Sequence, residues 1–145
     1  MSVTEDSLSH TRWECKYHVI FIPKYRKKAI LHELRKVLGE WFREFASRKE
    51  SRILEGHIMV DHVHVLVAIP PKYSVSQVVG YIKGRSAIWI ARNYFGRDRN
   101  FVGRHFWARG YYAGTVGRDE KLIAEYIRNQ EKRDMDEDRQ LGLGF

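Results

Sequence analysis

The sequence predicts an α+β protein with the element order strand, helix, strand, strand, helix, strand, and one further helix at the end. Apolar residues alternate over 13–22 and 61–69, which is typical of half-buried strands. They recur at steps of three and four over 29–49 and from residue 74 onward, which is typical of amphipathic helices. Pro70-Pro71 lies between the strand pattern over 61–69 and the helix pattern that begins near residue 74, and it ends this third predicted strand.

The first predicted strand has an apolar face made of its odd-numbered residues, from Trp13 to Phe21. The residues before it, 1–11, are polar and without pattern, and we expect them to be frayed. Pro23 closes the strand. A basic connector that contains one aromatic residue follows it: Lys24-Tyr25-Arg26-Lys27-Lys28.

The first helix is predicted over 29–49 because its large apolar residues lie on one stripe, which consists of Leu31, Leu34, Leu38, Trp41, Phe42 and Phe45. A second strand over 52–60 leads into the third strand through a tight turn at Asp61. After the second helix, the remaining predicted elements are an aromatic fourth strand over 106–116 and a last helix over 119–133.

The second helix is predicted to begin at Ser74, because Ser74 and Gln77 have the spacing of a capping box. Gly80 and Gly84 lie inside this helix, where each costs about 1 kcal/mol relative to Ala. We therefore expect another backbone or a ligand to come close to these glycines.

This order of elements is that of the ferredoxin-like and RNA-recognition-motif folds, in which helices cover one face of a four-stranded antiparallel sheet. The first and third strands are then neighbours at the centre of the sheet. Their apolar faces meet the helices, and the opposite, open face is predicted to hold Lys16, His18, His62 and His64.

Composition predicts one domain over residues 1–145 with a flexible acidic tail over 134–145. With 43% hydrophobic residues, the chain can form a sizeable core. Cys15 is the only cysteine, and the sequence has neither a signal peptide nor a membrane-length apolar run. We therefore expect a protein of the reducing cytoplasm that needs no membrane.

The formal net charge is +8, and the isoelectric point is near 9.7. Nucleic acid is the usual partner of a small basic domain, although excess Lys and Arg can also serve solubility alone. The charge therefore favours a nucleic-acid partner without identifying one.

His62 and His64 are two residues apart in a predicted strand, so their side chains share one face at a spacing of about 6.6 Å. Two imidazoles at this spacing can bind one metal ion, or they can be solvated histidines. Tyr126 and Gln130 share a face of the last helix. A tyrosine in an apolar stripe is usually part of the core, whereas Gln130 needs solvent or a polar partner such as a metal.

Five segments, in this order and spacing, give the chain a specific resemblance to one family. They are Cys15-Lys16-Tyr17-His18 with Pro23-Lys24-Tyr25-Arg26; Asp61-His62-Val63-His64; Val79-Gly80-Tyr81-Ile82-Lys83-Gly84; Phe106-Trp107-Ala108-Arg109-Gly110-Tyr111-Tyr112; and Tyr126-Ile127-Arg128-Asn129-Gln130. From residue 11 to residue 130, the chain resembles the single-tyrosine HUH transposases, the TnpA-type proteins of the bacterial and archaeal insertion-sequence 200/605 family.

The resemblance implies that His62, His64 and Gln130 bind a divalent metal, Mg²⁺ or Mn²⁺, although paired imidazoles alone would suggest a softer ion such as zinc. It implies that Tyr126 is the nucleophile. The implied enzyme is a transposase that cleaves and rejoins single-stranded DNA at hairpin-marked element ends through a 5′-phosphotyrosine intermediate. It is implied to be a homodimer in which the tyrosine helix of one subunit can complete the histidine site of the other.

Basic residues near the predicted open face are candidate DNA contacts. They are Lys16, His18, Lys24, Arg26, Lys83, Arg85, Arg104 and Arg109, and Tyr25 or Trp107 could stack on bases.

Three other functions fit parts of the sequence. A non-catalytic, RNA-recognition-like protein that binds single-stranded nucleic acid would need stacking aromatic residues on the open face, where this chain has lysine and histidine. A domesticated relative that cleaves chromosomal repeat hairpins would keep the same catalytic residues. A metal-dependent phosphohydrolase would use water and would not need Tyr126.

Overall fold

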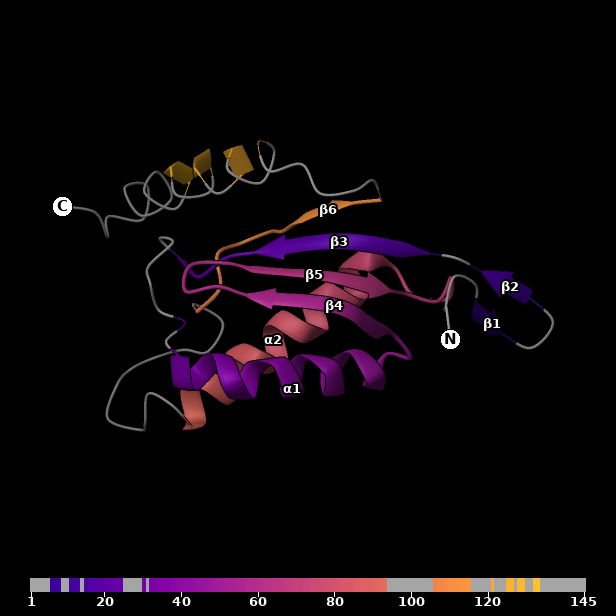
Figure 1. Cartoon of the computed structure of the whole chain (residues 1–145), viewed down its shortest axis with the longest axis horizontal. Helices are drawn as coiled ribbons and strands as arrows, with labels where there is room; N and C mark the ends of the chain where they lie inside the picture. Colours follow the sequence, from indigo (N-terminus) through magenta and orange to yellow (C-terminus); the bar gives the residue numbers. More distant parts are fainter. Residues whose placement is uncertain are drawn as a thin grey trace.

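A four-stranded antiparallel sheet with two helices on one face forms the centre of the structure, a computed structural model shown in Figure 1. The sheet consists of β3 (Lys16–Phe21), β4 (Arg52–Ile58), β5 (Val63–Ala68) and β6 (Tyr112–Gly114). The helices are α1 (His32–Arg48) and α2 (Val75–Asn93). The structure describes residues 6–8, 11–13, 15–24, 30, 32–93, 106–115, 121, 125–126, 128–129 and 132–133.

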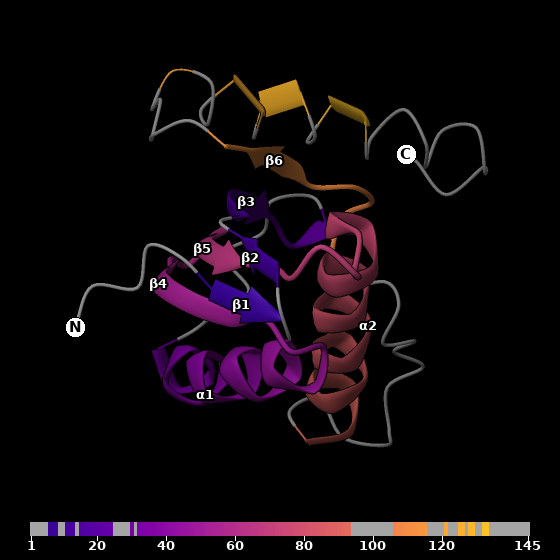
Figure 2. The same cartoon turned by 90° about the vertical axis from the view of Figure 1, so that its right-hand side faces the viewer.

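The strand order is β4-β5-β3-β6, so the first and third of the predicted strands are neighbours at the centre of the sheet. All three strand pairs are antiparallel. This arrangement confirms the predicted ferredoxin-like order for the described elements. Figure 2 shows α1 and α2 together on one side of the sheet.

The core lies between the sheet and the helices. Val63, Val65 and Val67 of β5 are buried there, as the alternation of the strand predicts. The ring of Phe21 on β3 packs edge-on against Phe42 of α1 at 5.7 Å and against Trp107 at 4.8 Å, measured between ring centroids. These contacts join one strand, one helix and the segment before β6.

The start of α2 confirms the predicted capping box. The backbone N–H of Gln77 donates to Ser74 Oγ at 3.1 Å, and the backbone N–H of Ser74 donates to Gln77 Oε1 at 2.8 Å. Two donors that have no partner inside the helix are therefore satisfied by side chains.

No backbone among the described residues comes close to Gly80 and Gly84, so one of the two neighbours suggested by the sequence is not found there. Within the described part of the chain, a Cβ added at either position would meet nothing within 4 Å, and both residues are exposed on α2. The prediction of a closely approaching backbone is therefore wrong for the described residues. The two glycines lower the stability of the helix without a packing reason among those residues.

The N-terminal region also differs from the expectation. Residues expected to be frayed form a short hairpin of β1 (Asp6–Leu8) and β2 (Thr11–Trp13). A hairpin of this kind is held by backbone hydrogen bonds, which need no alternation of apolar side chains. The absence of a pattern was therefore not evidence against strands.

The fourth strand is shorter than predicted, because β6 spans three residues instead of 106–116. Gly110 has a φ of 78°, which extended chain does not adopt, so the strand begins only after it. Before Gly110, Trp107 forms an isolated bridge with Pro23 and is buried.

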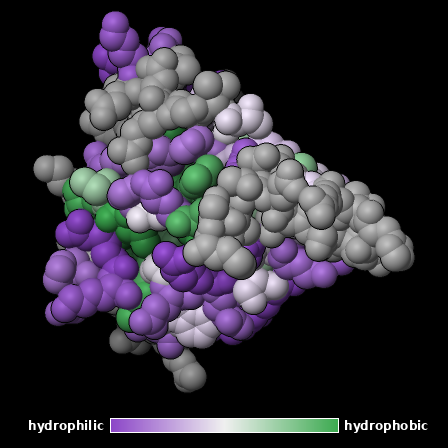
Figure 3. All heavy atoms as spheres, turned by 45° about the vertical axis from the view of Figure 1, so that its right-hand side comes forward, coloured by the Kyte–Doolittle hydropathy of each residue, from purple (hydrophilic) through white to green (hydrophobic). Residues whose placement is uncertain are grey.

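Hydrophilic side chains cover much of the described surface on the side shown in Figure 3. Among the described residues, Leu54, Met59 and Ile88 are large apolar side chains that are more than one third exposed. None of the described helices is long and apolar enough to cross a membrane.

Candidate active site

The candidate site lies on the sheet face opposite the two helices. His64 is the second residue of β5, and its neighbours Val63 and Val65 point into the core, so its side chain points the other way. It is only 6% exposed, so this face is less open at His64 than the sequence suggested. His62 comes just before β5 and is half-buried.

Each of these two histidines has a polar neighbour that fixes its ring. His62 Nδ1 lies 2.9 Å from Oδ1 of Asp61. His64 Nε2 lies 3.2 Å from Nδ1 of His18, and the two ring centroids are 5.3 Å apart. Metal-binding histidines in proteins are commonly held by such outer partners, which set the tautomer and the orientation of the ring.

His18 reaches His64 because β3 and β5 are adjacent. Ile20 lies directly opposite His64 in this pair, and His18 lies opposite Leu66. The two histidines are therefore diagonal neighbours on one face, a separation that long side chains can bridge. His18 was predicted to contact DNA, and the structure places it beside a candidate metal ligand.

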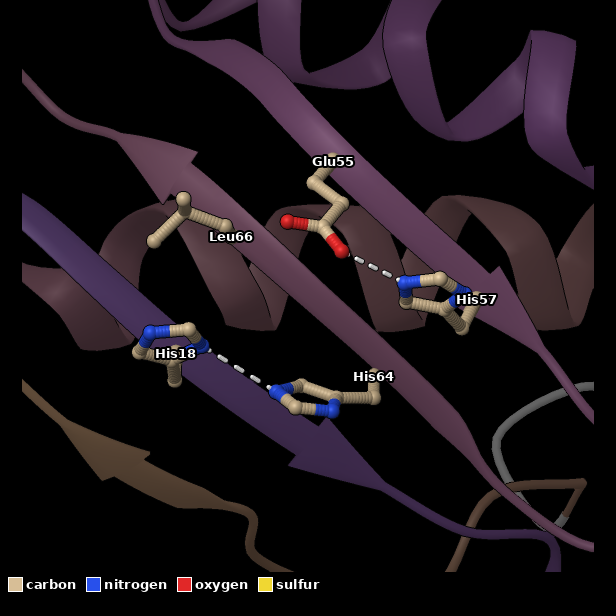
Figure 4. Close-up of a pocket in the computed structure, with 5 residues that line it drawn as sticks. All are labelled: His18, Glu55, His57, His64 and Leu66. Carbon is tan, nitrogen blue, oxygen red and sulfur yellow. Dashed lines mark hydrogen bonds and ion pairs between the residues drawn. The ribbon is translucent and has the colours of Figure 1, made fainter. Parts of the chain in front are cut away.

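A pocket of about 230 Å³ opens beside His64 and is lined by His18, Glu55, His57, His64 and Leu66. Figure 4 shows these side chains projecting from β3, β4 and β5. His57 lies directly opposite His64 across β4 and β5, with ring centroids 6.4 Å apart. Its Nε2 lies 2.7 Å from a carboxylate oxygen of Glu55.

Sequence reasoning missed Glu55 and His57. The feature that could have revealed them is the tight turn at residues 59–62. In this turn, the Met59 N–H donates to the His62 carbonyl at 2.8 Å. Folding the chain back on itself at this turn places His57 opposite His64.

The two histidines of Asp61-His62-Val63-His64 fit part of a divalent metal site. Both are imidazoles with a fixed ring, which is the form in which histidine binds metals. The described residues contain no group of three or more His, Cys, Asp and Glu side chains that could hold a metal ion. Gln130, the expected third ligand, lies outside the described residues.

Tyr126 lies near one end of the same sheet face. It is half-buried, and it packs against Ile22 and Ala108, while its ring centroid is 6.2 Å from that of Tyr112. Ile22 follows Phe21, the residue paired with Val63 between the two histidines. The described residues between 121 and 133 are helical and lie across the sheet from α1 and α2 (Figures 1 and 2).

The predicted DNA contacts fall into different parts of the structure. Lys16 is on β3, two residues before His18 and on the same face. Arg109 is exposed. Lys24 is half-buried, and its backbone N–H donates to the carbonyl of Phe106. Arg26 and Arg104 lie outside the described residues.

Lys83 and Arg85, both on α2, have other surroundings. Nζ of Lys83 donates to the carbonyls of Ala108 and Gly110. The guanidinium of Arg85 lies 5.8 Å from the ring centroid of Tyr81 in the helical layer. A hydrogen bond from Arg48 lowers the pKa of Tyr81.

The sequence of residues 11–130 matches the protein family described as "Transposase IS200 like". The chain belongs to this family. Transposases for insertion sequence element IS200 from Salmonella typhimurium and Salmonella typhi are each 44% identical to it over 130 residues, which are 90% of this chain and 86% of each relative. The ISDra2 transposase TnpA of Deinococcus radiodurans is 26% identical over 123 residues, which are 84% of this chain and 88% of that protein.

The fold of this IS200-like transposase also occurs in solved structures. The crystal structure of a candidate transposase from Deinococcus radiodurans aligns with a TM-score of 0.73 at 24% identity, over 86% of this chain and 96% of that one. A REP-associated tyrosine transposase bound to a REP hairpin aligns with a TM-score of 0.54 at 11% identity, over 94% of this chain and 76% of that one. At these identities the similarity concerns the fold.

Proposed function

We propose that this transposase cleaves and rejoins single-stranded DNA at hairpin-marked insertion-sequence ends through a covalent 5′-phosphotyrosine link at Tyr126. The observation that carries the proposal is the packing of Tyr126 against the cluster of Ile22 and Ala108, at the end of the sheet where Asp61-His62-Val63-His64 begins. Membership of the IS200-like family supports it, as do the IS200 relatives at 44% identity.

The metal ligands in this proposal are His62, His64 and Gln130, and the ion is Mg²⁺ or Mn²⁺. When bound, the ion would withdraw charge from a non-bridging oxygen of the scissile phosphate. Asp61 and His18 orient the two imidazoles through the contacts described above. Gln130 follows Tyr126 by one helical turn, so a single C-terminal helix would bring both residues to the site.

Tyr126 supplies the nucleophile. Its phenolic oxygen attacks the phosphorus, the bond from phosphorus to the DNA 3′ oxygen breaks, and the phenolic proton is lost as the 3′ hydroxyl gains one. The 5′ end of the second DNA segment is then esterified to Tyr126. One phosphate ester has replaced another, so a new DNA 3′ hydroxyl can attack the phosphotyrosine and reform a DNA strand without ATP.

The substrate in this proposal is a DNA hairpin with a single-stranded flank. The net charge of +8 favours a polyanion, and an unpaired strand can thread its backbone along the histidine face of the sheet. The solved REP-associated tyrosine transposase is bound to a REP hairpin, which is consistent with a hairpin as the recognition element. We further propose that the protein acts as a homodimer in the cytoplasm.

Covalent trapping tests the proposal. The protein is incubated with single-stranded DNA containing the hairpins that flank its own gene, with Mg²⁺ or Mn²⁺ or with a chelator, and is then run on a denaturing gel. We expect a metal-dependent adduct with the nucleotide on the Tyr126 peptide. Tyr126→Phe should abolish it, and Tyr73→Phe, which removes an exposed hydroxyl that bonds to Glu50, should not.

Other outcomes would identify the competing functions. Cleavage that persists in Tyr126→Phe would indicate a phosphohydrolase that uses water. Hairpin binding without any adduct, for DNA from both flanks and with either metal, would indicate a non-catalytic binding protein. Adduct formation on chromosomal repeat hairpins, with none on the gene flanks, would indicate a domesticated relative.

A further inference from the structure

The ammonium group of Lys83 lies where α2 meets the segment before β6. Its Nζ donates to the carbonyl of Ala108 at 2.8 Å and to the carbonyl of Gly110 at 2.6 Å. Hydrogen bonds from a charged donor are shorter and stronger than neutral ones. Lys83 therefore fixes the main chain of a turn that is 25 to 27 residues away in sequence.

The turn that Lys83 fixes needs such support. Gly110 has a φ of 78°, so the chain changes direction here and cannot continue the pairing of an extended strand. The side next to the core is already fixed, because Trp107 Nε1 donates to Ser86 Oγ at 2.9 Å. Ser86 Oγ in turn donates to the carbonyl of Lys83 at 3.1 Å. Lys83 extends this network from Trp107 to the next three residues.

The same turn forms the surface on which Tyr126 packs. Ala108 is 2% exposed and forms with Ile22 the buried cluster against which Tyr126 packs, and its N–H donates to the carbonyl of Ile22 at 2.8 Å. Tyr112, two residues after Gly110, contacts Tyr126 ring to ring. Lys83 therefore bonds to Ala108, which belongs to the cluster under Tyr126, and to Gly110, two residues before Tyr112.

We propose that Lys83 is a positioning residue for the nucleophile: it holds the 108–110 turn in place so that Ala108 and Tyr112 set the position of the Tyr126 ring. This inference rests on the proposed role of Tyr126 and replaces direct DNA contact as the role of Lys83. A small displacement of an attacking group can cost about 100-fold in rate. Substrate affinity need not change, because the ammonium group faces main-chain carbonyls.

The test compares Lys83→Met, which keeps a long side chain but removes the charge and the donors, with Lys36→Met, which removes an exposed charge from α1. Without DNA, hydrogen exchange is measured on peptides covering 106–115 and 121–133. With DNA, two quantities are measured: hairpin affinity as a function of salt, and the rate of adduct formation at saturating DNA.

In Lys83→Met, we expect the amide hydrogens of both peptides to exchange faster. We expect the adduct to form about 10- to 100-fold more slowly, with hairpin affinity within about twofold of wild type. Lys36→Met should match wild type in exchange and adduct rate. An affinity loss with a salt slope lower by about one would show that Lys83 contacts a phosphate, and would overturn the proposal. Unchanged exchange and unchanged rate would also overturn it.

Failure of the proposed function would look different. Wild-type protein would then form no adduct, while the exchange measurement would still report whether Lys83 holds the turn and the Tyr126 segment. If Lys83→Met does not fold, the same measurements are made on Lys83→Gln, which keeps two N–H donors without the charge. If Lys83 positions the turn, Lys83→Gln should show partial protection from hydrogen exchange and wild-type affinity for the hairpin. If Lys83 contacts a phosphate, Lys83→Gln should lose affinity for the hairpin.

Discussion

At the histidine site, individual contacts distinguish the residues that would bind a metal from the residues that orient those ligands. His64 has Nε2 bonded to His18, and His62 has Nδ1 bonded to Asp61. Both neighbours are close enough to set which nitrogen holds the proton and how the ring is turned. Removing such a partner typically lowers metal affinity about 10- to 100-fold even though every ligand remains.

We therefore predict that His18→Ala weakens Mn²⁺ binding by about 10- to 100-fold, measured by electron paramagnetic resonance of free Mn²⁺ without DNA. His18→Asn, whose side-chain amide can still bond to His64, should retain more of the affinity. His32→Ala removes an exposed imidazole at the start of α1 and is the control. Wild-type Mn²⁺ affinity in a folded His18→Ala protein would contradict the orienting role.

Sequence patterns pointed to those candidate site residues whose chemistry shows in short segments. His62 and His64 stand out because two imidazoles share a strand face, and Tyr126 stands out through the family resemblance. His57 and Glu55 were missed because their closeness to His64 depends on the register between two strands. The partners of Lys83 are main-chain carbonyls, which no residue type reveals.

Elements whose ends are marked by local chemistry were predicted well. The capping box placed the start of α2 correctly, because Ser74 and Gln77 satisfy each other's backbone donors within four residues. The start of the fourth strand was predicted poorly, because Gly110 interrupts the apolar pattern with a positive φ that sequence alone does not give. The β1–β2 hairpin was missed because its backbone pairing needs no apolar pattern.

The cap allows a prediction about α2, the helix that carries Lys83. Ser74→Ala removes one of the two reciprocal hydrogen bonds and should lower the free energy of unfolding by about 1 kcal/mol. Ser47→Ala, at an exposed position inside α1, is the control and should have a smaller effect. Urea denaturation followed by circular dichroism measures both, and equal values for the two variants would contradict a stabilising cap.

At the scale of the whole molecule, the two faces of the sheet have different roles. One face and the two helices form the core, and the other face holds His64, His18 and the packing surface of Tyr126. A tyrosine from a C-terminal segment that lies on this second face can be contributed within one subunit or by a partner. In the proposed homodimer, this difference can be measured by mixing two variants.

Mixing His64→Ala and Tyr126→Phe proteins, each inactive alone, distinguishes the two arrangements once subunits exchange. If the tyrosine of one subunit completes the histidine site of the other, a mixed dimer has one site with His64 from the Tyr126→Phe subunit and Tyr126 from the His64→Ala subunit. Random exchange makes about half of the dimers mixed, so about one quarter of the wild-type sites should be active.

Assembly of the site within one subunit gives the opposite result. Every site in the mixed dimer then lacks either its histidine or its tyrosine, and no adduct forms at any mixing ratio. Exchange is measured separately, by co-purification of an untagged variant with a tagged one, because mixing either variant with wild-type protein leaves the total number of active sites unchanged. No adduct in the exchanged mixture would therefore mean that Tyr126 serves the histidine site of its own subunit, across the packing surface formed by Ile22 and Ala108.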